Sequence, residues 1–138
     1  MKIYQNVSLV DLPLSTYDVI VVLKDKNDKE KFIRVQARTS QKSVSFISGT
    51  RGGVDRNYIS DVKKYRQSTT TSDIIIGVRP GENNSFDLYF VPTILVENLK
   101  QDSISLNKIQ FLKNNYKILE KCKYKSYVLK TCKANGIF

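Results

Sequence analysis

The feature of this sequence that most constrains its fold is a pair of strand-like segments joined by a fully polar one. Tyr17–Leu23 is rich in β-branched residues, which favours a buried strand. Phe32–Thr39 alternates apolar and polar residues, which is typical of a strand with one face buried and one face polar. The intervening Lys24–Lys31 is polar throughout and is centred near Asn27 and Asp28, which predicts a turn. The sequence therefore predicts a β-hairpin.

The hairpin is expected to bring three polar side chains together. A turn centred on Asn27 places Asp18 opposite Gln36, and Arg38 follows Gln36 on the same face of the strand. A carboxylate, a carboxamide and a guanidinium then converge at the open end of the hairpin. Oxygen ligands of the first two kinds suit Mg²⁺, so Asp18 and Gln36 are candidate metal ligands. A cation held there could bind a phosphate or orient a hydrolytic water.

Beyond the hairpin, the sequence predicts an α/β fold in which a mixed β-sheet is flanked by helices. Runs of β-branched and aromatic residues between turn residues indicate strands, and apolar residues at helical spacing indicate helices. Ser105 is the predicted N-cap of the second helix. The strands predicted beyond the hairpin are Ile3–Val10, Ser43–Ser48, Asp73–Val78 and Asp87–Val91, with weaker strand character at Tyr127–Leu129, and the predicted helices are Asn57–Gln67 and Ser105–Leu119.

Length and charge indicate one basic domain. The chain has 138 residues without a repeat or a linker-like stretch, so a single domain over 1–138 is predicted, with a Lys/Tyr-rich C-terminal extension from about residue 120. The net charge of +10 favours a polyanionic partner, namely nucleic acid or an acidic membrane face, and DNA is the predicted partner. A Lys-rich surface that serves solubility is the alternative. The apolar runs are too short to cross a membrane and no secretion leader opens the chain, so a cytoplasmic location is expected.

The absence of histidine and the spacing of the two cysteines limit the kinds of catalysis that this chain could perform. The sequence contains no histidine, which excludes histidine-based catalytic triads and His-ligated zinc. Cys122 and Cys132 are too far apart in sequence for a CxxC redox pair and are expected to be reduced structural cysteines of a cytosolic protein. Any catalysis must therefore use carboxylates, Lys, Arg, Tyr or a metal bound by oxygen ligands.

A second group of residues is predicted to contact nucleic acid. Arg51 and Arg56 lie in a glycine-rich basic loop just before the first predicted helix, a position that suits contact with phosphate. Lys63, Lys64 and Arg66 are expected to continue this basic surface along the helix. The alternative is an ordinary loop and helix with solvated charges. The Lys/Tyr-rich C-terminal segment is a further candidate, because tyrosines could stack on bases, unless they belong to the core.

Tyr17–Val22 followed by Phe32–Ser40 resembles the catalytic hairpin of the PD-(D/E)xK, or restriction-endonuclease-like, nuclease superfamily. Small homing-endonuclease-like and Holliday-junction-resolvase-like members come closest. In this superfamily a strand-initial Asp is followed on the next strand by an acidic residue, any residue and then Lys. The resemblance implies that Asp18 matches the metal-binding Asp, Gln36 the acidic position and Arg38 the Lys. It covers roughly residues 17–92 and implies the nuclease fold over that range.

The chain departs from the superfamily pattern in two ways. The superfamily normally has a helix before the first strand, but only sixteen residues precede Tyr17 here. Either that helix is lost or supplied elsewhere, or this chain is a piece of something larger. Arg38 replaces Lys, and a guanidinium cannot accept a proton. Because Gln36 stands at the acidic position, the candidate metal site keeps only one formal negative charge. Asp55, Asp61 or Asp73 is therefore expected to help if a divalent cation is bound.

Three functions follow from these residues. The first is a Mg²⁺- or Mn²⁺-dependent DNA phosphodiester hydrolase, in which Asp18 ligates the metal, Gln36 completes the metal site through its carbonyl oxygen, and Arg38 stabilises charge on the phosphate. It would act as a homodimer or within a larger nuclease assembly if it cuts both strands. The second is a catalytically inactive DNA-binding or protein-interaction module on the same fold. The third is a small basic interaction protein without a nucleic-acid function.

Overall fold

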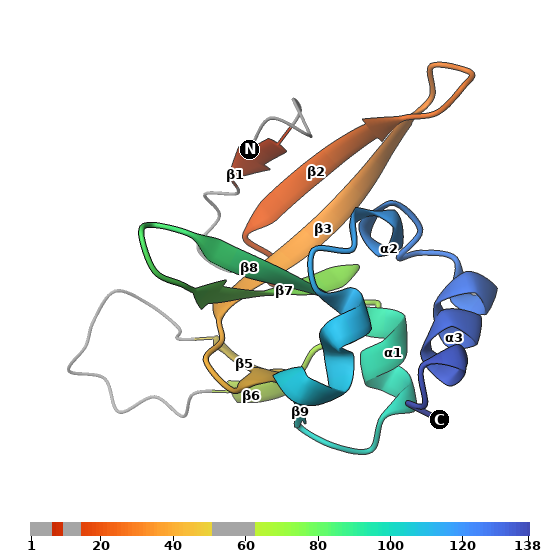
Figure 1. Cartoon of the computed structure of the whole chain (residues 1–138). Coiled ribbons are helices and arrows are strands. Elements are labelled where there is room, and N and C mark those ends of the chain that lie inside the picture. The colour runs from red at the N-terminus through yellow and green to blue at the C-terminus, as the bar shows by residue number, and fades with distance from the viewer. Residues whose placement is uncertain (1–6, 10–14, 51–62) are drawn as a thin grey trace.

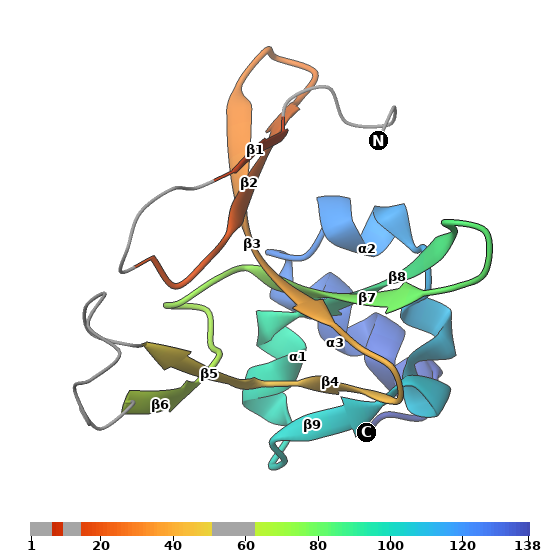
Figure 2. The same cartoon turned by 90° about the vertical axis from the view of Figure 1, so that its left-hand side faces the viewer.

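The computed structural model describes residues 7–9, 15–50 and 63–138. Its centre is a five-stranded mixed sheet, shown in two orthogonal views in Figures 1 and 2. Two smaller antiparallel sheets and several short helices surround it. The α/β class predicted from the sequence is therefore confirmed. In spatial order, the strands of the central sheet are β1 (Val7–Leu9), β2 (Val19–Lys24), β3 (Glu30–Thr39), β7 (Ile74–Pro80) and β8 (Phe86–Pro92).

The direction of the strands changes at β3. β3 pairs antiparallel with β2 and parallel with β7, and β8 runs antiparallel to β7. Because parallel neighbours need a long crossover, the chain leaves the sheet between β3 and β7. The described part of this crossover contains β4 (Ser43–Ser45), β5 (Ile47–Thr50) and β6 (Lys63–Arg66). β5 pairs with β6, and β4 pairs with the distant β9 (Ser103–Ser105).

The register of the β2–β3 hairpin is the one predicted from the sequence. Lys24 faces Glu30 at its end, so the hairpin is centred on Asn27. The Asp25 carboxylate accepts hydrogen bonds from the backbone N–H groups of Asn27 (2.8 Å) and Lys29 (2.9 Å). Asp28 has a positive φ of 61°, a conformation that Asp tolerates in turns. The polar turn therefore fixes the pairing of the two strands.

The alternation of β3 separates an apolar face of the sheet from a polar face. Ile33 and Val35 are buried on one face, and Arg34, Gln36 and Arg38 lie on the other. Figures 1 and 2 show the helix α2 (Tyr116–Glu120) on one side of the β3–β7–β8 part of the sheet, and the β4–β9 and β5–β6 pairs on the other. The two faces are thus covered by different elements.

The predicted strands are mostly confirmed. Those expected over Tyr17–Leu23, Phe32–Thr39, Asp73–Val78 and Asp87–Val91 form β2, β3, β7 and β8 with ends shifted by at most two residues. The strand expected over Ser43–Ser48 is divided into β4 and β5, because β4 pairs with β9 whereas β5 pairs with β6. Of the predicted Ile3–Val10, the described residues Val7–Leu9 form β1.

The helix predicted over Asn57–Gln67 is wrong in its described part. Residues 63–66 form β6, in which Tyr65 faces Ser48 of β5. The Gln67 N–H then donates to the Phe46 carbonyl at 2.7 Å and continues the contact with the β4–β5 segment. Tertiary pairing with β5 therefore overrides the local helical pattern. Residues 57–62 of this prediction lie outside the described residues.

The helix predicted over Ser105–Leu119 is broken in two. Ser105 is the N-cap, as predicted, but the segment that follows is the 3-10 helix η1 (Leu106–Leu112), with a kink at Ile109. Its buried residues lie three apart, which matches the three residues per turn of a 3-10 helix. Asn114 then adopts a positive φ of 53°, and its side-chain Oδ1 accepts from the Leu88 N–H at 3.0 Å. This bond to β8 ends η1, and the chain restarts as α2.

Two further helices differ from the sequence predictions. The strand character expected at Tyr127–Leu129 is wrong, because these residues lie in α3 (Lys125–Ala134), whose buried Val128 and Cys132 are four residues apart. The segment from about residue 120 therefore contributes to the core through α3. The helix α1 (Thr93–Asn98) was not predicted, because its first four residues are all buried and show no amphipathic pattern.

The two cysteines are free and buried, as expected of structural residues. Cys122 follows α2, and Cys132 lies in α3. Burial raises the pKa of the Cys122 thiol to about 12 and that of the Cys132 thiol to about 11. Both side chains are therefore neutral thiols at neutral pH, and they pack in the core as small apolar groups.

Gly77 supplies a test of the packing between β7 and the β4 segment. A Cβ atom at Gly77 would lie 2.7 Å from Val44 Cγ2 and 2.9 Å from Ser40 Oγ. Gly77→Ala is therefore expected to lower the free energy of unfolding by about 1–3 kcal/mol, as overpacking does in a close-packed core. The matched control is Gly81→Ala, whose Cβ would meet the hydroxyl of the exposed Ser85. Equal urea midpoints for the two variants would contradict this packing.

Candidate functional site on the polar face of the sheet

The side chains predicted to converge do so at the start of the hairpin. Asp18 directly precedes β2, and its N–H donates to the Val35 carbonyl at 2.8 Å, which extends the β2–β3 pairing by one residue. Gln36 Nε2 then donates to Asp18 Oδ2 at 2.7 Å, and the Ala37 N–H donates to the same oxygen at 3.0 Å. The predicted placement of Asp18 beside Gln36 is confirmed.

A buried glutamine that the sequence did not single out joins this pair to the rest of the face. Gln67 directly follows β6 and is only 1% exposed. Its Nε2 donates to Ser48 Oγ at 2.6 Å and makes a longer contact of 3.5 Å with Gln36 Oε1. Its Oε1 accepts from the hydroxyls of Thr71 (2.6 Å) and Ser72 (2.8 Å). The Gln67 amide is therefore satisfied at both ends.

Arg38 completes the group through the same serine. Its Nη2 donates to Ser48 Oγ, whereas its buried Nε has no hydrogen-bond partner in the described part of the chain. Burial lowers the pKa of the Arg38 guanidinium, and the electrostatic effects of Tyr65 and Asp18 offset this only in part. Within residues 7–9, 15–50 and 63–138, Arg38 forms no ion pair with a carboxylate. Its positive charge is therefore half-buried and has no ion-pair partner among the described residues.

Arg34, on the same face of β3, is in the opposite situation. Its Nη2 lies 3.0 Å from Asp73 Oδ1, and its Nε lies 3.2 Å from Asp73 Oδ2. Two further bonds run from its guanidinium to the carbonyls of Thr69 and Thr70. The hydrogen bonds that Arg34 donates to Asp73 raise the pKa of Arg34. Arg34 is therefore a structural ion-pair partner with its charge neutralised.

The Asp73 carboxylate is committed to this ion pair and is not part of the Asp18 group. Besides Arg34, Lys123 Nζ lies 3.7 Å from Asp73 Oδ2. Asp73 was one of three carboxylates considered as an additional metal ligand. The other two, Asp55 and Asp61, lie outside the described residues. The described polar face thus contributes a single carboxylate, that of Asp18, beside Gln36.

The donor atoms at this site do not fit a divalent cation shared by Asp18 and Gln36. Such a cation needs oxygen from both residues, but the amide of Gln36 presents its nitrogen to Asp18 and its oxygen to Gln67. Among the residues that the structure describes, no cluster of three His, Cys, Asp or Glu side chains is found. The predicted metal ligation by Asp18 and Gln36 would require the Gln36 amide to rotate, and it stays a prediction.

The residues predicted to bind nucleic acid are distributed differently from the expectation. Lys63 and Lys64 lie on β6 instead of a helix, and Arg51 and Arg56 lie outside the described residues. Arg66 is directed into the structure, where its Nη2 donates to the carbonyls of Val96 and Leu99 at the end of α1. Its guanidinium thus holds β6 against α1, and a DNA contact by Nη2 would require these bonds to break.

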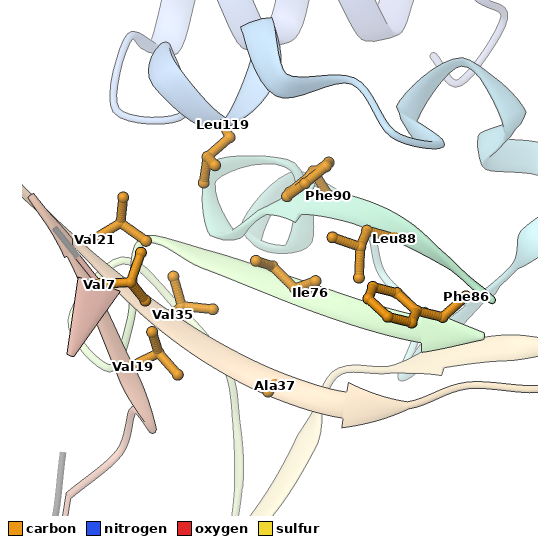
Figure 3. Close-up of a pocket in the computed structure, with 10 residues that line it drawn as sticks. All are labelled: Val7, Val19, Val21, Val35, Ala37, Ile76, Phe86, Leu88, Phe90 and Leu119. Carbon is orange, nitrogen blue, oxygen red and sulfur yellow. The ribbon is translucent and has the colours of Figure 1, made fainter. Parts of the chain in front are cut away.

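The opposite face of the sheet carries an apolar groove of about 490 Å³ (Figure 3). Val35 and Ile76 form its floor, with Phe86 and Val7 at its two ends and Leu119 of α2 above it. All of its lining residues are aliphatic or aromatic, so the groove offers no titratable or nucleophilic group. Of these two faces of the sheet, the polar one therefore carries the side chains that could take part in chemistry.

Comparison of the chain with protein-family models, curated proteins and solved structures gave no match. The resemblance to the PD-(D/E)xK superfamily therefore remains a prediction from the hairpin residues. None of the helices in the described ranges combines the length and the apolar character that crossing a bilayer requires.

The contrast between Arg34 and Arg38 predicts opposite effects on stability. Asp73→Asn removes the charge that neutralises Arg34, so we expect the free energy of unfolding to fall by about 2 kcal/mol. Arg38→Met removes a charge whose burial is not compensated, so we expect a change within about 1 kcal/mol, or a gain. Urea unfolding of the two variants measures both effects. A larger loss for Arg38→Met than for Asp73→Asn would contradict the assignment.

Proposed function

We propose that this chain binds DNA through the polar face that carries Asp18, Gln36 and Arg38, with a backbone phosphate at Arg38. The observation that supports this proposal is that the half-buried guanidinium of Arg38 has no ion-pair partner among the described residues. Its only hydrogen-bond acceptor in the described part of the chain is the neutral hydroxyl of Ser48, and its Nε is buried without a partner. A phosphate oxygen is the acceptor that best matches such a group, because guanidinium–phosphate bonds are charge-assisted and can be bidentate.

The overall charge supports the same proposal. The net charge of +10 attracts a polyanion over a distance, and release of counterions from the DNA would add affinity. On the polar face, Arg34 is already neutralised by Asp73, so Arg38 is the arginine of β3 whose charge remains available. The free, buried thiols of Cys122 and Cys132 suit a reducing compartment, which is consistent with a cytoplasmic location.

Metal-dependent hydrolysis of DNA is the second candidate function, and one observation favours it. The exposed carboxylate of Asp18 lies on the same face as Arg38 and is linked to it through Gln36, Gln67 and Ser48. In such a reaction Asp18 would hold Mg²⁺ or Mn²⁺, which would supply an activated water. Arg38 would stabilise negative charge on the phosphate and would not act as the base, since a guanidinium stays protonated.

DNA binding is tested by the salt dependence of affinity for a duplex oligonucleotide. For the wild type, we expect the logarithm of affinity to fall steeply with the logarithm of the salt concentration. Arg38→Met is expected to weaken binding about tenfold and to reduce the slope by about one, as loss of one phosphate contact would. Fluorescence anisotropy at several salt concentrations measures both quantities.

The matched control is Lys108→Met, which removes one exposed positive charge from η1, outside the polar face. We expect it to change the affinity for DNA less than twofold, because a charge that makes no direct contact with DNA is screened by salt. An affinity of the wild type that does not depend on salt, or an equal loss of affinity in the two variants, would contradict the proposed DNA contact at Arg38.

Hydrolysis is tested by incubating plasmid and oligonucleotide DNA with the protein and Mg²⁺ or Mn²⁺. We expect Asp18→Ala to reduce any metal-dependent cleavage by about 100-fold or more, because it removes the carboxylate beside Gln36. Arg38→Lys is expected to raise cleavage, since an ammonium can be tuned by burial and lie close to a water. Equal cleavage by wild type and Asp18→Ala would assign the activity to another site or to a contaminant.

A further inference from the structure

We propose that Gln67 is a positioning residue that decides which end of the Gln36 amide faces Asp18. By fixing the nitrogen of Gln36 toward the carboxylate, Gln67 keeps the Asp18–Gln36 pair in a form that does not hold a divalent cation. This inference concerns the same site as the proposed function and rests on that site, but it makes a separate statement about metal affinity. It also accounts for the misfit between the donor atoms and the metal site that the sequence predicts.

The direction of the Gln67 amide is set at its oxygen end. Thr71 Oγ1 accepts a hydrogen bond from the Ser68 N–H at 2.9 Å, and its hydroxyl faces two acceptors, Gln67 Oε1 at 2.6 Å and the Ser68 carbonyl at 3.0 Å. Ser72 Oγ donates to Gln67 Oε1 at 2.8 Å. The oxygen of Gln67 thus faces two hydroxyl groups, and its NH₂ group faces Ser48 and Gln36. The Gln67 side chain is 1% exposed, so these partners surround it inside the protein.

The Gln36 amide has a partner at each end, Asp18 at its nitrogen (2.7 Å) and Gln67 at its oxygen (3.5 Å). Gln67 Nε2 lies 3.5 Å from Gln36 Oε1, so an oxygen at this position meets a donor. If Gln36 rotated to offer its oxygen to a cation at Asp18, its NH₂ group would face the NH₂ group of Gln67. Two donors facing each other in a half-buried site form no hydrogen bond and repel. Gln67 therefore opposes the rotation that metal binding requires.

At the other end, Asp18 supports the same orientation in the absence of a cation. A carboxylate only accepts hydrogen bonds, and Asp18 Oδ2 receives them from Gln36 Nε2 and the Ala37 N–H. A cation beside Asp18 would reverse this preference and favour the Gln36 oxygen, whereas Gln67 would still oppose it. The balance between the two partners of Gln36 thus sets the metal affinity.

The experiment is a double-mutant cycle on Gln67 and Gln36, read out by binding of Mn²⁺ alone. Gln67→Met removes both amide groups without adding charge, so Gln36 is free to rotate. We expect Mn²⁺ to bind about tenfold more tightly than to the wild type, the size of one hydrogen-bonding conflict. In a Gln36→Met background, Gln67→Met is expected to leave the affinity unchanged, because no amide remains to rotate. Electron paramagnetic resonance of free Mn²⁺ measures the affinity.

The Ser72→Ala variant distinguishes an effect on the direction of the Gln67 amide from an effect on the stability of the protein. It removes one donor to Gln67 Oε1 but leaves Thr71 to fix the amide, so we expect a loss of stability with no change in Mn²⁺ affinity. If Gln67→Met does not fold, Gln67→Glu keeps the shape and the hydroxyl contacts of the side chain. Its added charge raises Mn²⁺ affinity in both backgrounds, and the part due to orientation is the additional gain seen only when Gln36 is present.

An unchanged affinity in Gln67→Met, or the same gain with and without Gln36, would overturn the positioning role. Because Mn²⁺ binding is measured without DNA, the two proposals fail separately. If the protein does not bind DNA but the double-mutant cycle gives the expected Mn²⁺ affinities, the proposed function is wrong and the role of Gln67 stands. If the protein binds DNA through Arg38 but the Mn²⁺ affinities differ from those expected, the role of Gln67 is wrong and the proposed function stands.

Discussion

The pairing of β3 with two neighbours of opposite direction is the constraint on which the rest of this structure depends. Because side chains alternate along a strand, β3 sends Ile33 and Val35 into an apolar layer and Arg34, Gln36 and Arg38 to the other face. Antiparallel pairing with β2 brings Asp18 to Gln36, and parallel pairing with β7 forces the chain into a long crossover. That crossover carries Ser48 and Gln67 back to the polar face, so the site is a direct consequence of the topology.

The hairpin and the placement of Asp18 beside Gln36 could be predicted from the sequence, because local features determine them. The polar turn around Asn27 fixes the register, and a register error of one residue would expose the apolar side chains of β3. The same reasoning could not find Gln67. Its partners Ser48, Thr71 and Gln36 come from three segments, and their approach depends on the pairing of β5 with β6. No local pattern distinguishes a buried, satisfied glutamine from an exposed one.

The helices were less predictable than the strands because tertiary contacts decide where they end. The apolar stripe between Ser105 and Leu119 is real, yet Asn114 bonds to the backbone of β8 and breaks it into η1 and α2. Conversely, α1 is buried on every side of its first turn, so it lacks the amphipathic spacing by which helices are recognised. In α3, the stretch of β-branched and aromatic residues at Tyr127–Leu129 favours a strand locally, whereas packing of Val128 and Cys132 selects the helix.

Arg34 and Arg38 show how two cations on one strand can have different surroundings. Both guanidinium groups lie on the same face of β3, but Asp73 raises the pKa of Arg34 while burial lowers that of Arg38. Burying a cation without an ion-pair partner is unfavourable, and Arg38 has only the neutral Ser48 hydroxyl as an acceptor among the described residues. The phosphate proposed at Arg38 would supply a charged acceptor. The same network turns the nitrogen of Gln36 toward Asp18, an orientation that does not suit a cation shared by the two residues.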